Sequence, residues 1–281
     1  MKIAELLSFI PNFLEFQESP LILDGKEVAY QNSVISTENV ALGTGFSLDR
    51  SLARQIGLSE AIERQLVANL YSSSQSRCYL LDEYPSTCGF AVGVNAKGAS
   101  DRAIAEAVER WLRSKWIDEH YALDEFKLRQ ESLSAVEQWF ACKFQEVRCF
   151  AHHCEIEVNT RISVSSVIVV GLTEQGAFVG SKSMVNSKVP LLPALVEAWR
   201  HLEISKTELD SNEARVIKHY AINRASALGQ IAQATRTSMP SPELRLLEEV
   251  NVPIKEFFAF RALCYDLSLI HISEPTRPLY I

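Results

Sequence analysis

The stretch LSEAIER at residues 58–64 returns in nearly the same form as IAEAVER at residues 104–110. A weaker third copy, LVEAWR, occupies residues 195–200. Repeats of this kind indicate one structural unit used several times along a chain. Prediction of the fold therefore starts from these three stretches and extends to the residues that flank them.

A glycine-bearing stretch precedes each copy: ALGTGFS at 41–47, GFAVGV at 89–94 and AFVGS at 177–181. Each of these is typical of a strand that ends in a turn, because glycine permits tight turns and close approach of another backbone. The copies themselves are typical of helices. The repeated unit is predicted to be a strand, a turn and a helix.

Apolar residues at helical spacing support these helices. In the second copy the stripe is formed by Ile104, Val108, Trp111 and Leu112. In the first copy it is formed by Leu52, Ile56, Ile62, Leu66 and Leu70. We expect Asp49 or Ser47 to cap the first helix, and Ser100 or Asp101 to cap the second.

The other segments complete an α+β prediction. Residues 156–170 are rich in Val, Ile, Ser and Thr and predict strands, and residues 172–180 predict a turn into a further strand, so a hairpin is expected. Residues 212–235 predict a mostly helical region, and residues 1–16 a short amphipathic helix. The sheets are expected to be mixed or antiparallel.

Bulk composition limits the classes of function. The chain has 281 residues, 47% hydrophobic and 22% charged, which is typical of a globular protein. Its net charge of −7 argues against a nucleic-acid partner but not against a nucleotide. The most apolar run, residues 164–172, is too short to span a membrane, so no membrane partner is expected. Residues 1–16 lack a signal-peptide cleavage site, and a cytoplasmic location is predicted.

Six cysteines are present without a Cys-x-x-Cys pair, and in a reducing cytosol they are expected to be free thiols. The densest group is Cys149, His152, His153 and Cys154. Two interpretations stay open: a metal site, or a junction between a helix and a strand that starts near Glu155. We favour the second.

The two stronger repeats place carboxylates in pairs. Residues three apart on a helix point to nearly the same side, so Glu60 pairs with Glu63, and Glu106 with Glu109. Mg²⁺ prefers oxygen ligands and often binds a few carboxylates together with phosphate oxygens. The alternative is an exposed helix stabilised by Glu–Arg pairs four residues apart. In the third copy, Arg200 replaces the second glutamate.

These motifs, taken in order, resemble the YcaO superfamily. The segments 43–47 and 58–64 are similar to its first nucleotide-binding motif, and the segments 89–93 and 103–110 to its second. Residues 193–200 fall where the family has a further helix. The resemblance implies a YcaO-like α+β fold and ATP-dependent phosphorylation of peptide backbone amides. The products would be azolines or thioamides.

The resemblance also implies a set of site residues. The expected Mg²⁺ ligands are Glu60, Glu63, Glu106 and Glu109. The expected ATP contacts are these four together with Ser47, Arg64, Arg110 and Glu197. No catalytic triad, Gly-x-Ser-x-Gly elbow or Walker-type loop is present in the sequence, and no catalytic residue is assigned.

The implied partners are a precursor peptide or protein substrate, an accessory modification protein and a second copy of the chain. Two alternatives are a non-catalytic YcaO-like scaffold that binds a peptide, and an unrelated α+β protein with solvated glutamates. Arg102 and Ser114 depart from the polar residues that flank the second motif in the family.

The end of the chain is interpreted separately. Residues 267–277 resemble the translation of a sequencing adapter, so 267–281 are excluded from fold reasoning. The expected domain is 1–266, incomplete at its C-terminus because family members continue into a Pro-rich tail.

Overall fold

The computed structural model describes residues 9–10, 12–81, 87–117, 119–158, 160–174, 176–206, 238–247 and 249–264. The predicted helical region 212–235 and the segment 267–281 lie outside these residues. The chain divides into two compact units. Unit 1 comprises Met1–Ala103 and Leu246–Ala262 with the last residues Leu279–Ile281, and unit 2 comprises Ile104–Arg245 and Leu263–Pro278.

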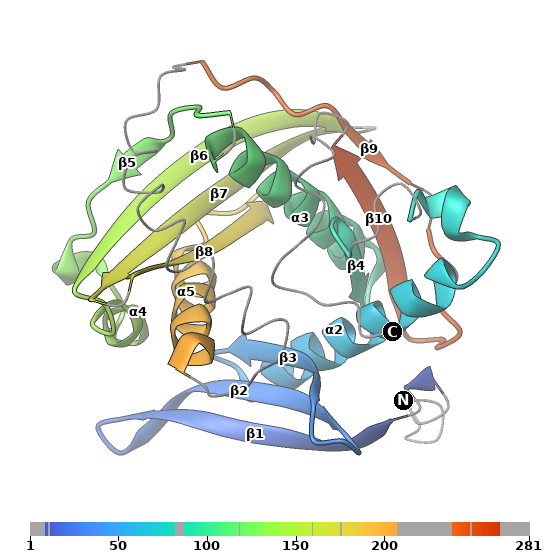
Figure 1. Cartoon of the computed structure of the whole chain (residues 1–281), viewed down its shortest axis with the longest axis horizontal. Helices are drawn as coiled ribbons and strands as arrows, with labels where there is room; N and C mark the ends of the chain where they lie inside the picture. The colour runs from blue at the N-terminus through green and yellow to red at the C-terminus, as the bar shows by residue number, and fades with distance from the viewer. Residues whose placement is uncertain are drawn as a thin grey trace. The chain divides into compact units, whose positions relative to one another are not determined.

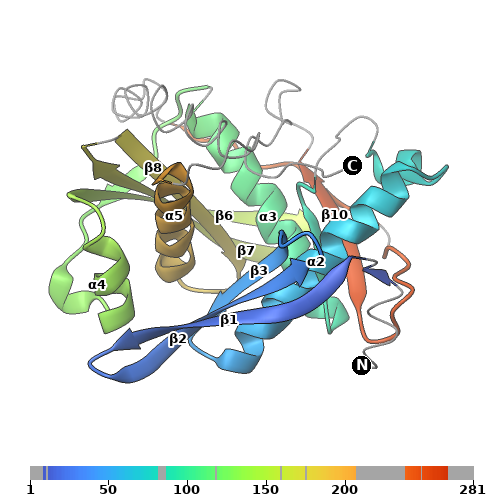
Figure 2. The ribbon, with the colours of Figure 1, turned by 60° about the horizontal axis from the view of Figure 1, so that its bottom comes forward.

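Unit 1 begins with an antiparallel sheet in the order β1-β2-β3, formed by Phe13–Leu23, Lys26–Ser36 and Ala41–Ser47. Helix α2 (Arg50–Tyr71) packs on β3 and β2 (Figures 1 and 2). A short 3₁₀ helix, Ser76–Tyr79, follows α2. The sheet is thus covered by the helix that directly follows its last strand.

A second pairing in unit 1 joins β4 (Phe90–Gly93) to β10 (Phe258–Cys264) in an antiparallel register. The sheet order is β4-β10-β9, where β9 is Leu244–Leu246. A hydrophobic core gathers buried side chains from α2, from β4 and from the segment before β10. Its largest contributors include Ile62, Leu66, Phe90, Ile254 and Phe257.

The predicted helix at residues 1–16 is wrong for residues 13–16, because β1 begins at Phe13, whereas Phe9 is helical. The physical reason is the turn that follows: Asp24 and Gly25 both have positive φ, 50° and 73°, which suits a tight hairpin turn. That turn returns the chain along β1, so the backbone groups of residues 13–23 find partners in β2.

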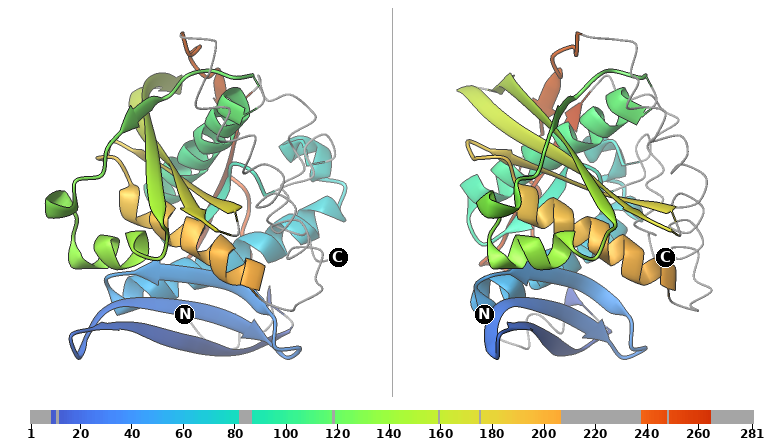
Figure 3. Two further views of the ribbon diagram at one scale, coloured as in Figure 1. Left: turned by 60° about the vertical axis from the view of Figure 1, so that its left-hand side comes forward. Right: turned by 90° about the vertical axis from the view of Figure 1, so that its left-hand side faces the viewer.

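Unit 2 contains a four-stranded antiparallel sheet in the order β5-β6-β7-β8. Its strands are Asp124–Phe126, Glu146–Val158, Thr160–Thr173 and Gly176–Val185. Helix α5 (Leu191–Lys206) packs on β8 and β7, and the short helix α4 (Ala135–Ala141) packs on α5 (Figure 3). The 3₁₀ turn Gln130–Ser132 precedes α4. The predicted hairpin is confirmed as β7–β8, and the antiparallel alternative for the sheets holds.

Helix α3 (Ala96–Ile117) begins in unit 1 and continues into unit 2. Its start is earlier than predicted: Asn95, not Ser100 or Asp101, precedes the first turn, and its Oδ1 accepts the N–H of Gly98 at 2.6 Å. The predicted apolar stripe is buried throughout. Within unit 2, Trp111 lies against His152 and Trp116 against Phe150 of β6, with ring centroids 6.2 and 5.1 Å apart.

Helix α2 starts as predicted, since the Asp49 side chain accepts the N–H of Leu52 at 2.8 Å. Its predicted stripe needs one correction, because Leu52 is 45% exposed and lies outside the core. Among the described residues, no helix is both long and apolar enough to cross a membrane.

Candidate functional site

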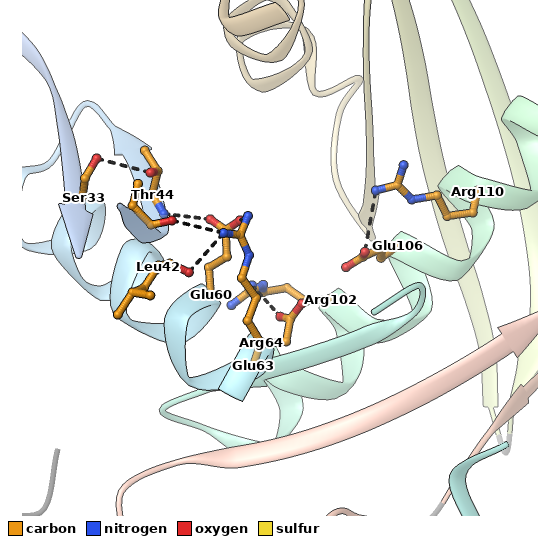
Figure 4. A network of polar contacts seen from close by, with 10 residues as sticks. Ser33, Leu42, Thr44, Glu60, Glu63, Arg64, Arg102, Glu106 and Arg110 are labelled. Carbon is orange, nitrogen blue, oxygen red and sulfur yellow. Dashed lines mark hydrogen bonds and ion pairs between the residues drawn. The ribbon is translucent and has the colours of Figure 1, made fainter. Parts of the chain in front are cut away.

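In unit 1, Glu60 fastens α2 to β3. Its Oε2 accepts the backbone N–H of Thr44 at 2.9 Å, and its Oε1 lies 2.8 Å from Nη2 of Arg64 (Figure 4). Arg64 in turn donates through Nη1 to the carbonyl of Leu42 at 3.1 Å. Glu60 and Arg64, which lie one turn apart on α2, therefore bind the β3 backbone at Thr44 and at Leu42.

Unit 2 repeats this arrangement on β8 and α5. Oε2 of Glu197 accepts the backbone N–H of Ser181 at 2.7 Å. Nδ1 of His201 lies 2.7 Å from the carbonyl oxygen of Val179, so Nδ1 is the protonated nitrogen, because a carbonyl only accepts. The glutamate hydrogen bond spans 16 residues in both units. We call each of these contacts, Glu60 to Thr44 and Glu197 to Ser181, a strand–helix clamp.

Glycines bring each helix close enough for its clamp. A Cβ atom on Gly43 would collide with the carbonyl oxygen of Gly57 in α2, and one on Gly180 with the carbonyl oxygen of Ala194 in α5. A Cβ on Gly93 would meet Ala99 only at 3.4 Å, an ordinary contact. The strand–helix pair β3–α2 therefore has a structural counterpart in β8–α5. In β4–α3 the helix does not approach the strand glycine as closely.

Glu63 is buried, with a side chain 2% exposed. Nη2 of Arg102 lies 4.0 Å from its Oε2, and Nη1 of Arg102 donates to the carbonyl of Val92 at 2.9 Å (Figure 4). Such burial is not what an exposed Glu–Arg helix surface predicts, because an ionised carboxylate is rarely removed from water without partners. Arg102, first noted as a departure from the family pattern, thus lies beside one of the expected metal ligands.

The second carboxylate pair lies in unit 2, where its members differ in surroundings. Oε1 of Glu106 is 3.8 Å from Nη2 of Arg110 (Figure 4). Glu109 is held by short contacts with β8: its Oε1 accepts the hydroxyl of Ser181 at 3.0 Å, and its Oε2 accepts the N–H of Ser183 at 3.1 Å. Glu109 therefore attaches α3 to β8.

Two further cations adjust the electrostatics of unit 2. Nζ of Lys182 lies 3.7 Å from Oε2 of Glu109. Burial raises the pKa of Glu197, but its electrostatic interactions with His201, Arg113 and Arg110 and the N–H of Ser181 outweigh burial and hold this pKa below its ordinary value. Burial lowers the pKa of His201 and outweighs the opposite effects of Glu197 and of the Val179 carbonyl, so the imidazole is neutral at pH 7.

Ser47, an expected ATP contact, is the last residue of β3, two residues before the helix cap Asp49. Its Oγ accepts the N–H of Asp49 at 3.1 Å, while Asp49 itself caps the helix. The structure therefore places Ser47, Glu60, Glu63 and Arg64 in unit 1. It places Glu106, Glu109, Arg110 and Glu197 in unit 2.

The acidic side chains of the site are the donors available for a metal ion. No group of three or more His, Cys, Asp or Glu side chains that could hold a metal ion exists within the described residues. Mg²⁺ does not require such a cage, since one or two carboxylates and the phosphate oxygens of a substrate commonly suffice. The paired glutamates fit that manner of binding in donor type.

The alternative metal site around Cys149 is not supported. All four residues lie within β6, which starts at Glu146, so the expected junction near Glu155 is placed too late. Burial raises the pKa of Cys149 to about 12 and that of Cys154 to about 11. Successive side chains of a strand point to opposite faces, so Cys149 and His153 lie on the other face of β6 from His152 and Cys154. His153 is exposed and lies beside Ser165, with Nδ1 and Oγ 3.3 Å apart.

Sequence reasoning missed several partners of the expected residues. They are Thr44, Ser181, Ser183, Lys182, Arg113 and His201. The equal spacing between each clamp glutamate and its strand partner is a signal that could have located Ser181 and Glu197 together. The contacts of Glu109 join α3 to a strand far along the chain and leave no local pattern.

No protein-family model matches the sequence, and no curated protein matches it. Solved structures do match. YcaO from Methanopyrus kandleri, bound to AMPPCP and Mg²⁺, aligns with a TM-score of 0.58 at 13% identity over 98% of this chain and 91% of that chain. A heterocyclase in complex with substrate and cofactor aligns with a TM-score of 0.51 at 10% identity over 94% of this chain.

The chain spans 52% of the length of that heterocyclase. At these identities the likeness concerns the fold, and the fold defined by both units is an α+β fold of the YcaO type. The predicted fold class is confirmed.

Proposed function

We propose that this chain binds ATP with Mg²⁺ and phosphorylates a backbone amide of a ribosomally made peptide or protein. The observation in support is the burial of acidic side chains on helices of a YcaO-type fold, with Glu63 only 2% exposed. The related YcaO binds AMPPCP and Mg²⁺, and the related heterocyclase binds a substrate and a cofactor. The products would be azolines or thioamides.

The contacts suggest a division of roles among the proposed ligands. Glu60 and Glu109 each use both carboxylate oxygens in short contacts with the protein, at 3.1 Å or less. Glu63 lies 4.0 Å from Arg102, and Glu106 lies 3.8 Å from Arg110. We propose all four glutamates as Mg²⁺ ligands, and we propose that Glu60 and Glu109 also hold the helices in place.

Arginines would provide the counter-charges. A guanidinium offers forked donors that suit phosphate oxygens, so Arg64, Arg102 and Arg110 are proposed phosphate contacts. Glu197 is proposed to act through the clamp, by fixing β8, and Ser47 to contact the nucleotide from the end of β3. Bound ATP supplies the phosphoryl group that converts the amide oxygen into a leaving group.

The partners follow from this activity: a peptide substrate, an accessory modification protein and a second copy of the chain. We propose a cytoplasmic location, where ATP is available. Its support is that all six cysteines are free thiols, as expected in a reducing compartment.

Calorimetry with AMPPCP tests the proposal. We expect binding that requires Mg²⁺, weakened about 10- to 100-fold in Glu63→Gln and in Glu106→Gln, the usual range for loss of one charged partner. Glu203→Gln is the matched control, because the Glu203 side chain is 46% exposed and pairs with Lys206 on the same helix. Absence of Mg²⁺-dependent binding by the unaltered chain would remove the proposal.

A variant that carries both Glu63→Gln and Glu106→Gln tests whether the two glutamates bind one and the same magnesium–nucleotide complex. If they do, the losses of binding free energy in the two single variants are coupled and do not add; independent sites give additive losses.

The engagement of Glu60 and Glu109 within the protein also favours a second candidate function, a nucleotide-independent scaffold that binds a peptide. Peptide binding without any AMPPCP binding would support that candidate.

A further inference from the structure

Part of one edge of strand β6 in unit 2 has no partner strand among the described residues. On the side away from β7, β5 pairs with β6 only at Cys149, Phe150 and Ala151. The strand continues to Val158, and no strand of the described part pairs with residues 152–158 on that side. The edge of such a strand presents unpaired N–H and C=O groups to any extended chain beside it.

A hollow of about 620 Å³ is lined by residues 152–157, which belong to this part of β6. Arg161 of β7 and the residues Met239, Pro240 and Ser241 complete its lining. Its volume falls within the ~300–1,000 Å³ typical of ligand sites. The hollow therefore adjoins the part of β6 that β5 leaves unpaired, and a stretch of chain distant in the sequence also lines it.

The charged residues that line the hollow determine whether an anionic or a basic group suits it better. Glu155 and Glu157 line it together with Arg161. Arg161 is paired with Glu155, whereas Glu157 has no ion pair within the described residues. Burial lowers the pKa of His152, a further lining residue, which keeps its ring neutral at pH 7. The net charge of the lining is negative, which disfavours an anion and suits a basic side chain.

We propose that this hollow binds an extended segment of the peptide substrate as an added strand along β6, with a basic side chain opposite Glu157. Addition of a strand to a sheet edge takes its affinity from main-chain hydrogen bonds and its selectivity from alternate side chains. This inference rests on the proposed function for the kind of ligand, but the site lies within unit 2 and requires no nucleotide.

The test uses the full chain and short fluorescein-labelled peptides of alternating threonine and valine. One peptide has a central lysine, a second has a central glutamate, and a third has the lysine with N-methyl groups on alternate backbone nitrogens. Fluorescence anisotropy measures binding without ATP, and hydrogen exchange locates it. We expect the lysine peptide to bind best and to slow exchange at residues 152–158.

Two matched variants complete the test. Glu157→Gln should weaken the lysine peptide about two- to fivefold, the effect of one exposed ion pair. Glu146→Gln should leave it unchanged, because Glu146 is also exposed on β6 but lies at the opposite end of the strand.

The inference is overturned by equal binding of the lysine and N-methylated peptides, by indifference to Glu157→Gln, or by protection elsewhere. It is also overturned if residues 152–158 become protected with rising protein concentration alone, since a second copy would then occupy the edge. Calorimetry with AMPPCP is independent of all these readouts. Failure of the peptide site and failure of the proposed function are therefore distinguishable.

Discussion

Replacement of Glu197 by alanine measures what a strand–helix clamp contributes to stability. The carboxylate accepts the N–H of Ser181 at 2.7 Å, and Ser181 is only 1% exposed. Loss of a hydrogen bond to a charged group costs about 1.5–3 kcal/mol, and a buried donor left without an acceptor costs about 1–3 kcal/mol. These contributions overlap, so we expect a total loss of about 2–4 kcal/mol in the free energy of unfolding.

Two companion variants separate charge from geometry. Glu197→Gln keeps an acceptor for Ser181 but removes the charge that attracts Arg110 and Arg113. Because charged hydrogen bonds are about twice as strong as neutral ones, we expect it to cost roughly half as much as Glu197→Ala. Glu203→Ala, on the exposed side of the same helix, should change stability by less than about 0.5 kcal/mol.

Urea unfolding followed by circular dichroism is the assay. Stability should change through the midpoint at an unchanged m-value, because the surface exposed on unfolding is nearly the same. The reasoning is refuted if Glu197→Ala costs no more than Glu203→Ala, or if Glu197→Gln costs as much as Glu197→Ala. Glu60→Ala should show the same order with a smaller loss, because its partner Thr44 is only partly buried.

Three other expectations follow from the same contacts. The thiols of Cys149 and Cys154, with pKa values raised to about 12 and about 11, should react with a maleimide at pH 8 only after unfolding, whereas exposed Cys142 reacts at once; mass spectrometry of the labelled peptides decides this. Because burial holds the pKa of His201 below 6.5, the unfolded chain takes up the proton first and stability should fall as the pH drops below about 6.5. His201→Gln should flatten that part of the urea-midpoint profile, and an unchanged slope would contradict the assignment. Gly180→Ala should lower stability by about 1–3 kcal/mol through collision with the backbone of α5, and an unaltered urea midpoint would show that the two elements can separate at no cost.

The sequence predicted those elements whose pattern is local. Apolar spacing located α2 and α3, and the β-branched run located the β7–β8 hairpin, because burial of one face imposes a period on the residues themselves. The Asp24–Gly25 turn was an equally local signal, typical of a hairpin, and its neglect led to the wrong expectation at residues 13–16. Attention to that turn would have predicted β1 and β2.

Partners that are distant along the chain could not be predicted in this way. Glu109 was expected to be a Mg²⁺ ligand or part of an exposed helix surface, and it is 4% exposed and bonded to Ser181 and Ser183. Its helix shows no periodic sign of these contacts, because a hydrogen bond between α3 and β8 constrains only single positions on each. The location of a carboxylate on a helix was predictable, but its partners were not.

The three repeats also show why sequence similarity and structural similarity can differ. By sequence the second copy resembles the first more closely, since both read Glu-x-x-Glu-Arg. By structure the third copy is the counterpart of the first, with Glu197 in the place of Glu60 and a glycine-flanked strand residue 16 positions earlier in each.

A strand–helix clamp fixes only the glutamate, the glycine and their spacing, so the position three residues after the glutamate is not constrained by the clamp. That position is Glu63 in the first copy and Arg200 in the third. It follows that function can differ between the units at this position while the clamp keeps their folds alike, and that Glu63 rather than Glu60 is the residue whose replacement should separate loss of nucleotide binding from loss of stability.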